Sequence, residues 1–259
     1  MARFKLEIEY EGTRYSGWQV QKNSKTIQGS LLNAADSIFK GEKVDIQGSG
    51  RTDSGVHALC QIAHLEVNTT LTPEIIRMRF NDNLPYDINL LSVQKIHSKF
   101  HARHDAISRS YVYQISRRRT AFGKSFVWWV KDNLNFSKMN SASKIFLGMK
   151  NFSSFTDDVE LDKSTKVLIE EIQLVESGNL ILIKIKGSHF LWKMVRRIVG
   201  ILVEIGRGNI PEERLKYYLS ETTNEPAKFT APPSGLFLEQ VLYKGDKPNN
   251  NITPFLSIM

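Results

Sequence analysis

The sequence has a single cysteine among its 259 residues, Cys60, which excludes an internal disulfide and a cysteine-rich metal cluster. No run approaches the roughly 20 consecutive apolar residues that a membrane-spanning helix requires. The first residues, MARFKLEIEYEG, alternate polar and apolar side chains and lack the apolar core of a signal peptide. These absences predict a cytoplasmic protein in a reducing compartment.

Two common phosphate-binding patterns are also missing. The stretch IQGSGRTDSGVHALC, residues 46–60, is rich in glycine, but it does not contain GxxxxGK followed by Ser or Thr. Gly48 and Gly50 fit the first two glycines of GxGxxG, whereas Asp53 occupies the place of the third. The stretch is therefore not one of these anion-binding loops.

Ligands suited to a metal ion are few. His97 and His101 have helical i, i+4 spacing and His104 lies close by, but acidic partners are absent and Arg103 would repel a cation. The acidic run DDVELD, residues 157–162, is more typical of a solvated loop than of a divalent-ion site. Cys60 lies among apolar residues and is interpreted as a small core residue. We predict no metal site.

The residues that are present favour a polyanionic partner. The chain carries 35 Lys and Arg against 27 Asp and Glu, a formal net charge of +8. Such a balance favours nucleic acid before an anionic membrane, with a plain enzyme of basic surface as the alternative. With 41% hydrophobic residues, the chain can form the core of one large domain or of two small ones.

Apolar residues recur with period two in several short segments, which predicts strands, and with helical spacing in others. In RFKLEIEY, residues 3–10, one face is apolar and the other charged, as in an antiparallel strand with one covered face. Further strands are predicted in the segments 58–67, 89–97, 108–116, 166–176, 179–187 and 235–243. Helices are predicted in the segments 26–39 (with Thr26 as N-cap), 71–85 (opened by Thr72 and Pro73), 136–149, 190–206 and 211–219.

These elements predict an α+β fold of two similar halves, each a mostly antiparallel sheet with helices on one face. The predicted halves are residues 1–104 and 105–245. A hairpin is expected around Ser177, Gly178 and Asn179. The Asn- and Pro-rich end, residues 246–259, predicts a loosely held tail.

The glycine-framed stretch presents one carboxylate, Asp53. Gly48, Gly50 and Gly55 allow tight or left-handed backbone geometry, so the loop can hold a side chain at a defined point. Arg51 would favour the ionised carboxylate, which suits nucleophilic, base or electrostatic roles better than that of a general acid. The alternative is an Asx-turn, in which Asp53 caps its own loop and pairs with Arg51. The residues alone leave this choice open.

Other segments have the features of an RNA-binding protein. SRRRTAFGKSFVWWVK, residues 116–131, interleaves basic residues with aromatics, at least half of which are expected in the core. Tyr111 and Tyr113 share one face of a predicted strand, which suits base stacking or ordinary sheet packing. In KMVRR, an arginine on an apolar helix needs a partner or a cleft, which makes Arg196 a candidate partner for Asp53. The polar loop EGTRYSGWQVQ is predicted to expose Trp18.

Several segments, in order, resemble the TruA family of tRNA pseudouridine synthases. GSGRTDSGVHA resembles the family's G-R-T-D-A-G-V-H-A loop, and YEGTRYSGWQVQ resembles its opening strand and loop. FHARHDAISRSYVY resembles the family's F-x-A-R…S-R-x-Y segment. FLWKMVRRIVG resembles its F-L-x-x-M-V-R helix, and APPSGLFLEQV its A-P-x-x-G-L-x-L closing strand. The resemblance extends over nearly the whole chain.

The resemblance implies an isomerase that converts uridine to pseudouridine at nucleotides 38 to 40 of the tRNA anticodon arm. It implies a central RNA-binding cleft between the two halves and a homodimer, with no metal, organic cofactor or membrane. Asp53 matches the nucleophile, and Arg196 matches the arginine that pairs with it. Tyr111 matches the tyrosine packed on the target base, and Leu236 matches the apolar residue of the base pocket. Arg51 matches the residue that helps to flip or replace that base.

The sequence departs from the family pattern at a few positions. Ser54 replaces the usual alanine, His104 stands where Phe is common, and Trp192 and Lys193 replace a frequent basic-His pair. Trp192 and Lys193 are expected to affect which nucleotides are modified, but not the reaction itself.

Two other functions compete with this one. An RNA-binding module without catalysis would share the basic charge and the aromatic strands, but it would leave Asp53 unexplained. A metal-dependent nuclease would need several convergent carboxylates, and the loop supplies one.

Overall fold

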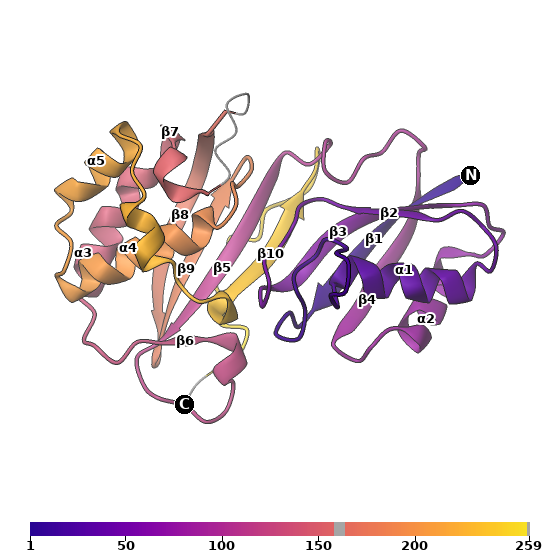
Figure 1. Ribbon diagram of the computed structural model, residues 1–259, viewed down its shortest axis with the longest axis horizontal. Coiled ribbons are helices and arrows are strands. Elements are labelled where there is room, and N and C mark those ends of the chain that lie inside the picture. The colour runs from indigo at the N-terminus through magenta and orange to yellow at the C-terminus, as the bar shows by residue number, and fades with distance from the viewer. Residues whose placement is uncertain (158–163, 258–259) are drawn as a thin grey trace. The chain divides into compact units, whose positions relative to one another are not determined.

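The computed structural model of the protein describes residues 1–157 and 164–257, so most of the acidic run at 157–162 lies outside the described residues. None of the helices within these ranges has both the length and the apolarity needed to cross a membrane. The chain forms two compact units (Figure 1). Unit 1 comprises Met1–Ile107 and Phe237–Pro248, and unit 2 comprises Ser108–Leu236 and Asn249–Met259.

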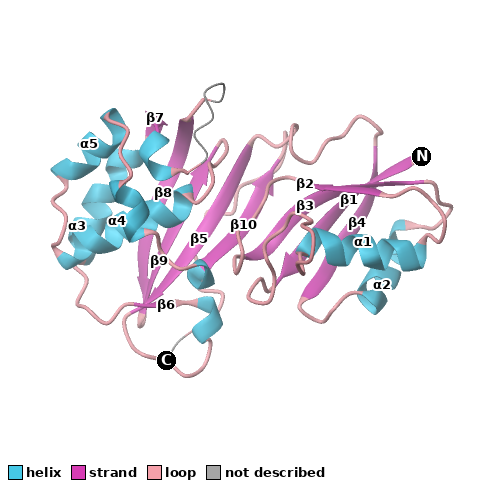
Figure 2. Ribbon diagram, viewed as in Figure 1, coloured by secondary structure: helices cyan, strands magenta, loops and turns pink. Residues whose placement is uncertain are grey.

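Unit 1 is a sheet with two helices on one face (Figure 2). In this sheet β1 lies between β4 and β3 and is antiparallel to both. The other edge of β3 is shared, because β2 pairs with it antiparallel at residues 63–66 and β10 pairs in parallel at residues 57–58. The elements are β1 Ala2–Tyr10, α1 Ile27–Ile38, β2 Asp45–Gly48, β3 His57–Val67, α2 Pro73–Asn83, β4 Ile88–Ile96 and β10 Leu236–Leu242.

Local sequence signals explain most of unit 1. In β1 every second residue from Phe4 to Tyr10 is buried, and the charged residues between them are partly exposed. Thr26 caps α1 by accepting a hydrogen bond from the Gly29 N–H at 3.2 Å, as predicted. Thr72 caps α2 in the same way, with Pro73 at the first helical position. The predicted strands and helices of unit 1 are therefore confirmed, whereas the four-residue β2 was not predicted.

A buried histidine in unit 1 should make its stability sensitive to acid. His64, on β3, is 1% exposed, and its Nδ1 accepts a hydrogen bond from the Ala102 N–H at 3.2 Å. Burial, then the neighbouring His101 and Arg3, lowers the pKa of His64 from 6.5 to about 4. The unfolded chain therefore binds the proton more tightly than the folded chain. We expect the stability that neutral His64 provides to be complete above about pH 6.5 and to fall by about 2–3 kcal/mol toward pH 4.

Urea unfolding at a series of pH values measures this loss. In the variant His64→Gln, the part of the pH dependence between about pH 6.5 and pH 4 should shrink. His97→Gln is the matched control, because His97 is exposed and lies in the same unit, and it should keep the wild-type pH dependence. An unchanged dependence in His64→Gln would show that His64 is not its source.

Unit 2 also consists of paired strands with helices on one face (Figure 2). Its strand order is β5-β9-β8-β7, antiparallel throughout, and β6 adds to β5 in parallel. The strands are β5 Ser108–Ser116, β6 Trp128–Trp129, β7 Gly148–Asn151, β8 Lys166–Ser177 and β9 Leu180–Gly187. The α-helices are α3 Phe136–Ser143, α4 Met194–Arg207 and α5 Glu213–Ser220. Short 3₁₀ turns are η1 Lys124–Phe126, η2 Lys144–Phe146, η3 Ser153–Phe155, η4 Glu225–Phe229 and η5 Pro233–Gly235.

The α+β class predicted from the sequence is confirmed in both units. The predicted hairpin of β8 and β9 is also confirmed, with Gly178 at φ 57° in its turn. Helix α4 differs from its prediction because it begins at Met194 instead of Phe190. Lys193 has φ +61°, and this left-handed residue stops the helix from extending further back. Within α4 the residues Met194–Gly206 are buried except Arg196, which is half-buried.

Part of the tail at 246–259, for which composition predicts a loosely held segment, packs on unit 2. Ile252 packs against the core residues Val127, Leu180 and Leu182. The Phe255 N–H donates to the side-chain oxygen of the buried Gln114 at 2.7 Å. A few apolar side chains between the asparagines therefore anchor the segment, which overall composition does not reveal.

Candidate active site

The glycine-framed stretch forms the connection between β2 and β3. The backbone leaves the sheet after Gly48 and returns at His57, where the edge of β3 changes its partner from β2 to β10. The buried Ser49 donates from Oγ to Gln61 Oε1 at 2.7 Å, and Gln61 Nε2 donates to the Gly50 carbonyl at 3.1 Å. These two bonds fix the first half of the loop to β3.

Thr52, the residue before Asp53, is fixed from the other side of the loop. Its carbonyl oxygen accepts a hydrogen bond from the Trp18 N–H at 3.1 Å. Its hydroxyl shares a hydrogen bond of 2.8 Å with the hydroxyl of Tyr10, the last residue of β1. The backbone that enters Asp53 is therefore tied to the central strand of unit 1.

Tyr15 holds the residues that follow Asp53. Its carbonyl oxygen accepts from Ser54 Oγ at 3.0 Å and from the Gly55 N–H at 3.3 Å. At its other end, the Tyr15 hydroxyl donates to the buried Asp87 carboxylate. Burial and this carboxylate raise the pKa of Tyr15 well above its ordinary value, so the hydroxyl remains a donor. Ser54, which replaces the alanine usual in the family pattern, thus provides one of the two contacts.

The turn at Asp53 is closed by the backbone. The Val56 N–H donates to the Asp53 carbonyl oxygen at 3.2 Å, and Gly55 has φ +77°, as the third residue of a type II turn requires. An Asx-turn would instead direct the Gly55 N–H to the Asp53 carboxylate, but this N–H donates to Tyr15. The half-buried carboxylate is therefore not needed to form its own turn.

The glycines of the loop have different roles. Gly55 supplies the left-handed backbone of the turn. Gly48 is required for a steric reason, because a Cβ at this position would lie 2.6 Å from the Trp18 ring. The prediction that Trp18 is exposed was wrong, because this ring is 2% exposed. Neither reason applies to Gly50, where a Cβ would meet no atom within 4 Å.

Arg51 is exposed, and its Nε donates to Gln19 Oε1 at 3.2 Å. Gln19 Nε2 in turn donates to Gln28 Oε1 at 2.7 Å, which links the loop to helix α1. The guanidinium is thus directed by the polar loop that follows β1. This loop therefore positions the residues on both sides of Asp53.

The two tyrosines of β5 are distinguished by their burial. Tyr113 is fully buried, and its hydroxyl donates to the Pro232 carbonyl oxygen at 2.7 Å, so ordinary sheet packing is its role. Burial raises the pKa of Tyr113 well above its ordinary value. Tyr111 is half-buried, and its ring meets Phe190 edge to face with centroids 5.1 Å apart. Of the pair, Tyr111 is therefore the one whose side chain is partly exposed.

Arg196 and Leu236 belong to unit 2. Arg196 is half-buried on the first turn of α4, and its Nε donates to the Ala231 carbonyl oxygen at 2.7 Å. The Ala231 N–H donates back to the Arg196 carbonyl oxygen at 3.1 Å, so the residue is held at both ends. Leu236 is buried at the start of β10, directly after η5.

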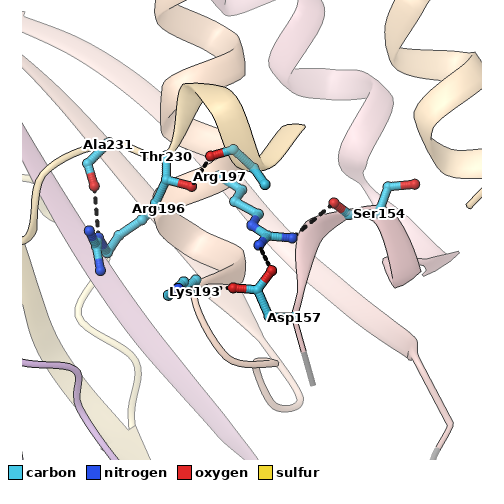
Figure 3. A network of polar contacts seen from close by, with 8 residues as sticks. Ser154, Asp157, Lys193, Arg196, Arg197, Thr230 and Ala231 are labelled. Carbon is cyan, nitrogen blue, oxygen red and sulfur yellow. Dashed lines mark hydrogen bonds and ion pairs between the residues drawn. The ribbon is translucent and has the colours of Figure 1, made fainter. Parts of the chain in front are cut away.

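The neighbouring Arg197 points the other way and is 1% exposed (Figure 3). Its Nη1 donates to the Ser154 carbonyl oxygen at 3.2 Å, and its Nη2 pairs with Asp157 Oδ1. Asp157 Oδ2 also accepts from Lys193 Nζ at 2.9 Å. The Lys193 hydrogen bond, then that of Arg197, lowers the pKa of Asp157 below its ordinary value.

The aromatic side chains of the segment at 116–131 are half-buried or exposed, so the expectation that at least half of them lie in the core was wrong. Trp128 lies edge to face against the buried Tyr113, and Phe126 contacts Phe255. Phe122 is 87% exposed, and Trp129 is exposed with the Arg119 guanidinium 6.0 Å from its ring centroid. The exposed members have the composition of a surface that contacts RNA.

The structure gives no support to a metal site among the histidines. The rings of His64, His101 and His104 are neighbours, with centroids 4.8 and 4.2 Å apart. However, His101 Nδ1 accepts from the Arg103 N–H at 3.1 Å, so this nitrogen is already engaged. Across residues 1–157 and 164–257, no group of three or more His, Cys, Asp or Glu could hold a metal ion. Cys60 is half-buried, and burial, then Glu7, raises the pKa of its thiol to about 12, which fits an inert residue.

A sequence model of the family described as tRNA pseudouridine synthase matches residues 7–105 and 142–244, well over half of the chain. The chain belongs to this family.

Curated relatives match at similar length. The tRNA pseudouridine synthase A of Rhodopseudomonas palustris (strain BisA53) is 38% identical over 247 residues, covering 94% of this chain and 100% of the relative. That of Clostridium botulinum (strain Alaska E43 / Type E3) is 36% identical over 245 residues, with the same coverage. Among solved structures, that of a Cbf5-Nop10-Gar1 complex matches with 10% identity and a TM-score of 0.34, covering 78% of this chain and 54% of that one. This score is too low to carry weight.

Membership confirms the resemblance seen in the motifs and makes the chain an isomerase that acts on tRNA. The GRTDSGVHA stretch, and with it Asp53, lies within the first matched range. Tyr111 lies between the two ranges, and Arg196 and Leu236 lie within the second.

Sequence reasoning missed the pair of Arg197 and Asp157. One signal for it was available, because Arg197 lies three residues after Met194 and one before Ile198, on the apolar side of the helix. Its carboxylate partner, 40 residues earlier in the chain, had no comparable signal.

Proposed function

We propose that this member of the family isomerises uridine to pseudouridine at positions 38–40 of the tRNA anticodon stem-loop, with Asp53 as the nucleophile. The observation that carries the proposal is a half-buried carboxylate on a turn fixed by Thr52, Tyr15 and Gly55, none of which needs the carboxylate for its own bonds. A rigid turn that presents one carboxylate suits attack on a single atom of a bound substrate.

The reaction rearranges bonds without changing composition. The C1′–N1 bond of uridine breaks and a C1′–C5 bond forms, while C5 loses a proton and N1 gains one. A carboxylate can hold the intermediate at C6 of the base or at C1′ of the sugar, and both routes return Asp53 unchanged. Because no atom or electron is supplied from outside, the reaction needs no metal and no organic cofactor.

The other site residues take the roles that the family resemblance implies. Tyr111 packs on the target base, Leu236 lines its pocket, and Arg196 pairs with the nucleophile. Arg51 helps to flip or replace the base, which must leave its stack before the enzyme can reach it. We further propose that the protein works as a cytoplasmic homodimer. The net charge of +8 favours the tRNA backbone as partner.

Mapping of the product tests the substrate assignment. Unmodified tRNA transcripts are incubated with the enzyme in the presence of a chelator, and pseudouridine is located by carbodiimide treatment and primer extension. We expect modification within nucleotides 38 to 40, at the same rate with and without chelator. A transcript whose uridines at these positions are replaced by cytidine is the matched control and should remain unmodified. Modification confined to another arm of the tRNA would refute the assignment.

A further inference from the structure

Trp192 is a large aromatic side chain with an unusual degree of exposure for its position. It lies directly before α4, between the half-buried Leu191 and Lys193, and yet 50% of its surface is exposed. The ammonium group of Lys193 lies 4.3 Å from the centroid of the indole ring. One part of the ring is therefore covered by a cation, and the rest faces solvent.

Lys193 is held in turn by a chain of ionic contacts that ends in the core. Its Nζ donates to Asp157 at 2.9 Å, and Asp157 also pairs with the buried Arg197 (Figure 3). Arg197 is anchored by the Ser154 carbonyl oxygen. The exposed indole is thus connected, through one lysine and one carboxylate, to a guanidinium that cannot move freely.

The backbone at this point is strained. Among the described residues other than glycine, Asn23 and Lys193 alone have positive φ, and each is at φ 61°. A lysine in this conformation persists only where surrounding contacts hold it, and such residues cluster at functional sites. The same contacts set the direction of Trp192, its immediate neighbour in the chain.

We propose that Trp192 is a stacking platform for an unpaired nucleobase next to the target uridine, which rests on the proposed function and extends it. A flat, exposed indole stacks on any base, and nearby cations attract the adjoining phosphates. Arg196, which the proposed function places at the reacting base, follows Lys193 by three residues on the first turn of α4. The family's frequent basic-His pair at 192–193 has no indole, so the platform is a property of this chain.

A second copy of the chain fits this surface less well than RNA does. A symmetric contact between copies places the same patch on both sides. Lys193 and the half-buried Arg196 would then face their own counterparts, with Asp157 as the carboxylate that pairs with Lys193. A polyanion meets no such repulsion.

Unit 2 contains a matched control. Tyr217, on α5, is 42% exposed, and the Arg214 guanidinium lies 4.4 Å from its ring centroid. Arg214 pairs with Glu225 at 2.6 Å. The three groups repeat the order of aromatic ring, cation and carboxylate found at Trp192, but on a different helix and without a strained backbone.

The test uses an anticodon stem-loop RNA with 2-aminopurine beside the target uridine. We expect Trp192→Ala to raise the Kd about 5- to 50-fold and to abolish the quenching of 2-aminopurine that stacking causes. The single-turnover rate at saturating RNA should fall much less than the affinity. Trp192→Phe should restore most of both signals, and Tyr217→Ala should match the wild type. Thermal unfolding of each variant shows whether a lost signal reflects lost fold.

Two outcomes would overturn the platform. The first is unchanged RNA affinity and unchanged quenching in Trp192→Ala. The second is a loss of dimer mass in Trp192→Ala with unchanged RNA affinity, which would assign the surface to a protein contact. The same measurements on an Asp53→Asn background separate this proposal from the proposed function. A Trp192 effect on binding there supports the platform whether or not Asp53 is the nucleophile. If Asp53→Asn remains active, the nucleophile assignment fails. The Kd of Trp192→Ala for the RNA then still decides whether Trp192 is a stacking platform.

Discussion

Asp53→Asn should abolish pseudouridine formation while tRNA affinity stays within about threefold of the wild type. Asparagine has the shape of aspartate, but it cannot form the covalent bond, so the rate should fall on the order of 10⁴-fold or more. The turn should survive, because its closing bond uses the Asp53 backbone carbonyl and its supports come from Thr52 and Tyr15. Release of tritium from tRNA labelled at uridine C5 measures the reaction directly, since C5 loses its hydrogen.

Asp45→Asn is the matched control for this result. Asp45 is an exposed carboxylate at the start of β2, a few residues before the loop, and it accepts a hydrogen bond from Gln47 at 2.6 Å. Its neutralisation changes the net charge by the same amount as that of Asp53. We expect activity near that of the wild type. Tritium release by Asp53→Asn at more than about a hundredth of the wild-type rate would rule out Asp53 as the nucleophile.

Much of the fold could be predicted because its signals are local. The alternation in β1, the caps Thr26 and Thr72, and the helical spacing in α1 each depend on residues within one or two turns of chain. The strands that were not predicted, β2, β6 and β7, have two to four residues, which is too few for a period to appear. The parallel pairing of β10 with β3 joins Phe237 to His57, a separation that no local pattern encodes.

The candidate site shows the same limit at the level of side chains. The loop and its carboxylate could be located from glycine spacing, but the choice against an Asx-turn required the destination of the Gly55 N–H, which is Tyr15. Trp18 was predicted to be exposed because its neighbours are polar, whereas it fills the space that Gly48 leaves open. Arg196, and not Arg197, was predicted to be the partner of Asp53. The two side chains leave the helix about 100° apart, and only Arg197 is fully buried.

Asp157→Ala should lower the free energy of unfolding by about 2–3 kcal/mol, although Asp157 itself is exposed. The substitution leaves the Arg197 guanidinium in the core with the Ser154 carbonyl oxygen but without its carboxylate. Removing one partner of a fully buried pair costs about 3–5 kcal/mol, and the exposure of Asp157 reduces this. Arg197→Met should cost less than Asp157→Ala, because an apolar side chain of similar length fills the space and no buried charge remains. Urea unfolding near pH 7 measures both changes.

The double variant gives the sharper test, because its stability depends on why the single variants are unstable. If the cost of Asp157→Ala is that of an unpaired buried cation, then adding Arg197→Met should recover part of it, and the two changes will not be additive. Additive losses would mean that Asp157 acts through Lys193 alone.

Acid provides an independent check, since the contacts with Lys193 and Arg197 lower the pKa of Asp157. The stability that Asp157 contributes should therefore be complete above about pH 4 and be lost as the pH falls through its lowered pKa. Asp157→Ala should lack this part of the acid dependence, and the Arg197→Met variant should keep the portion that Lys193 provides.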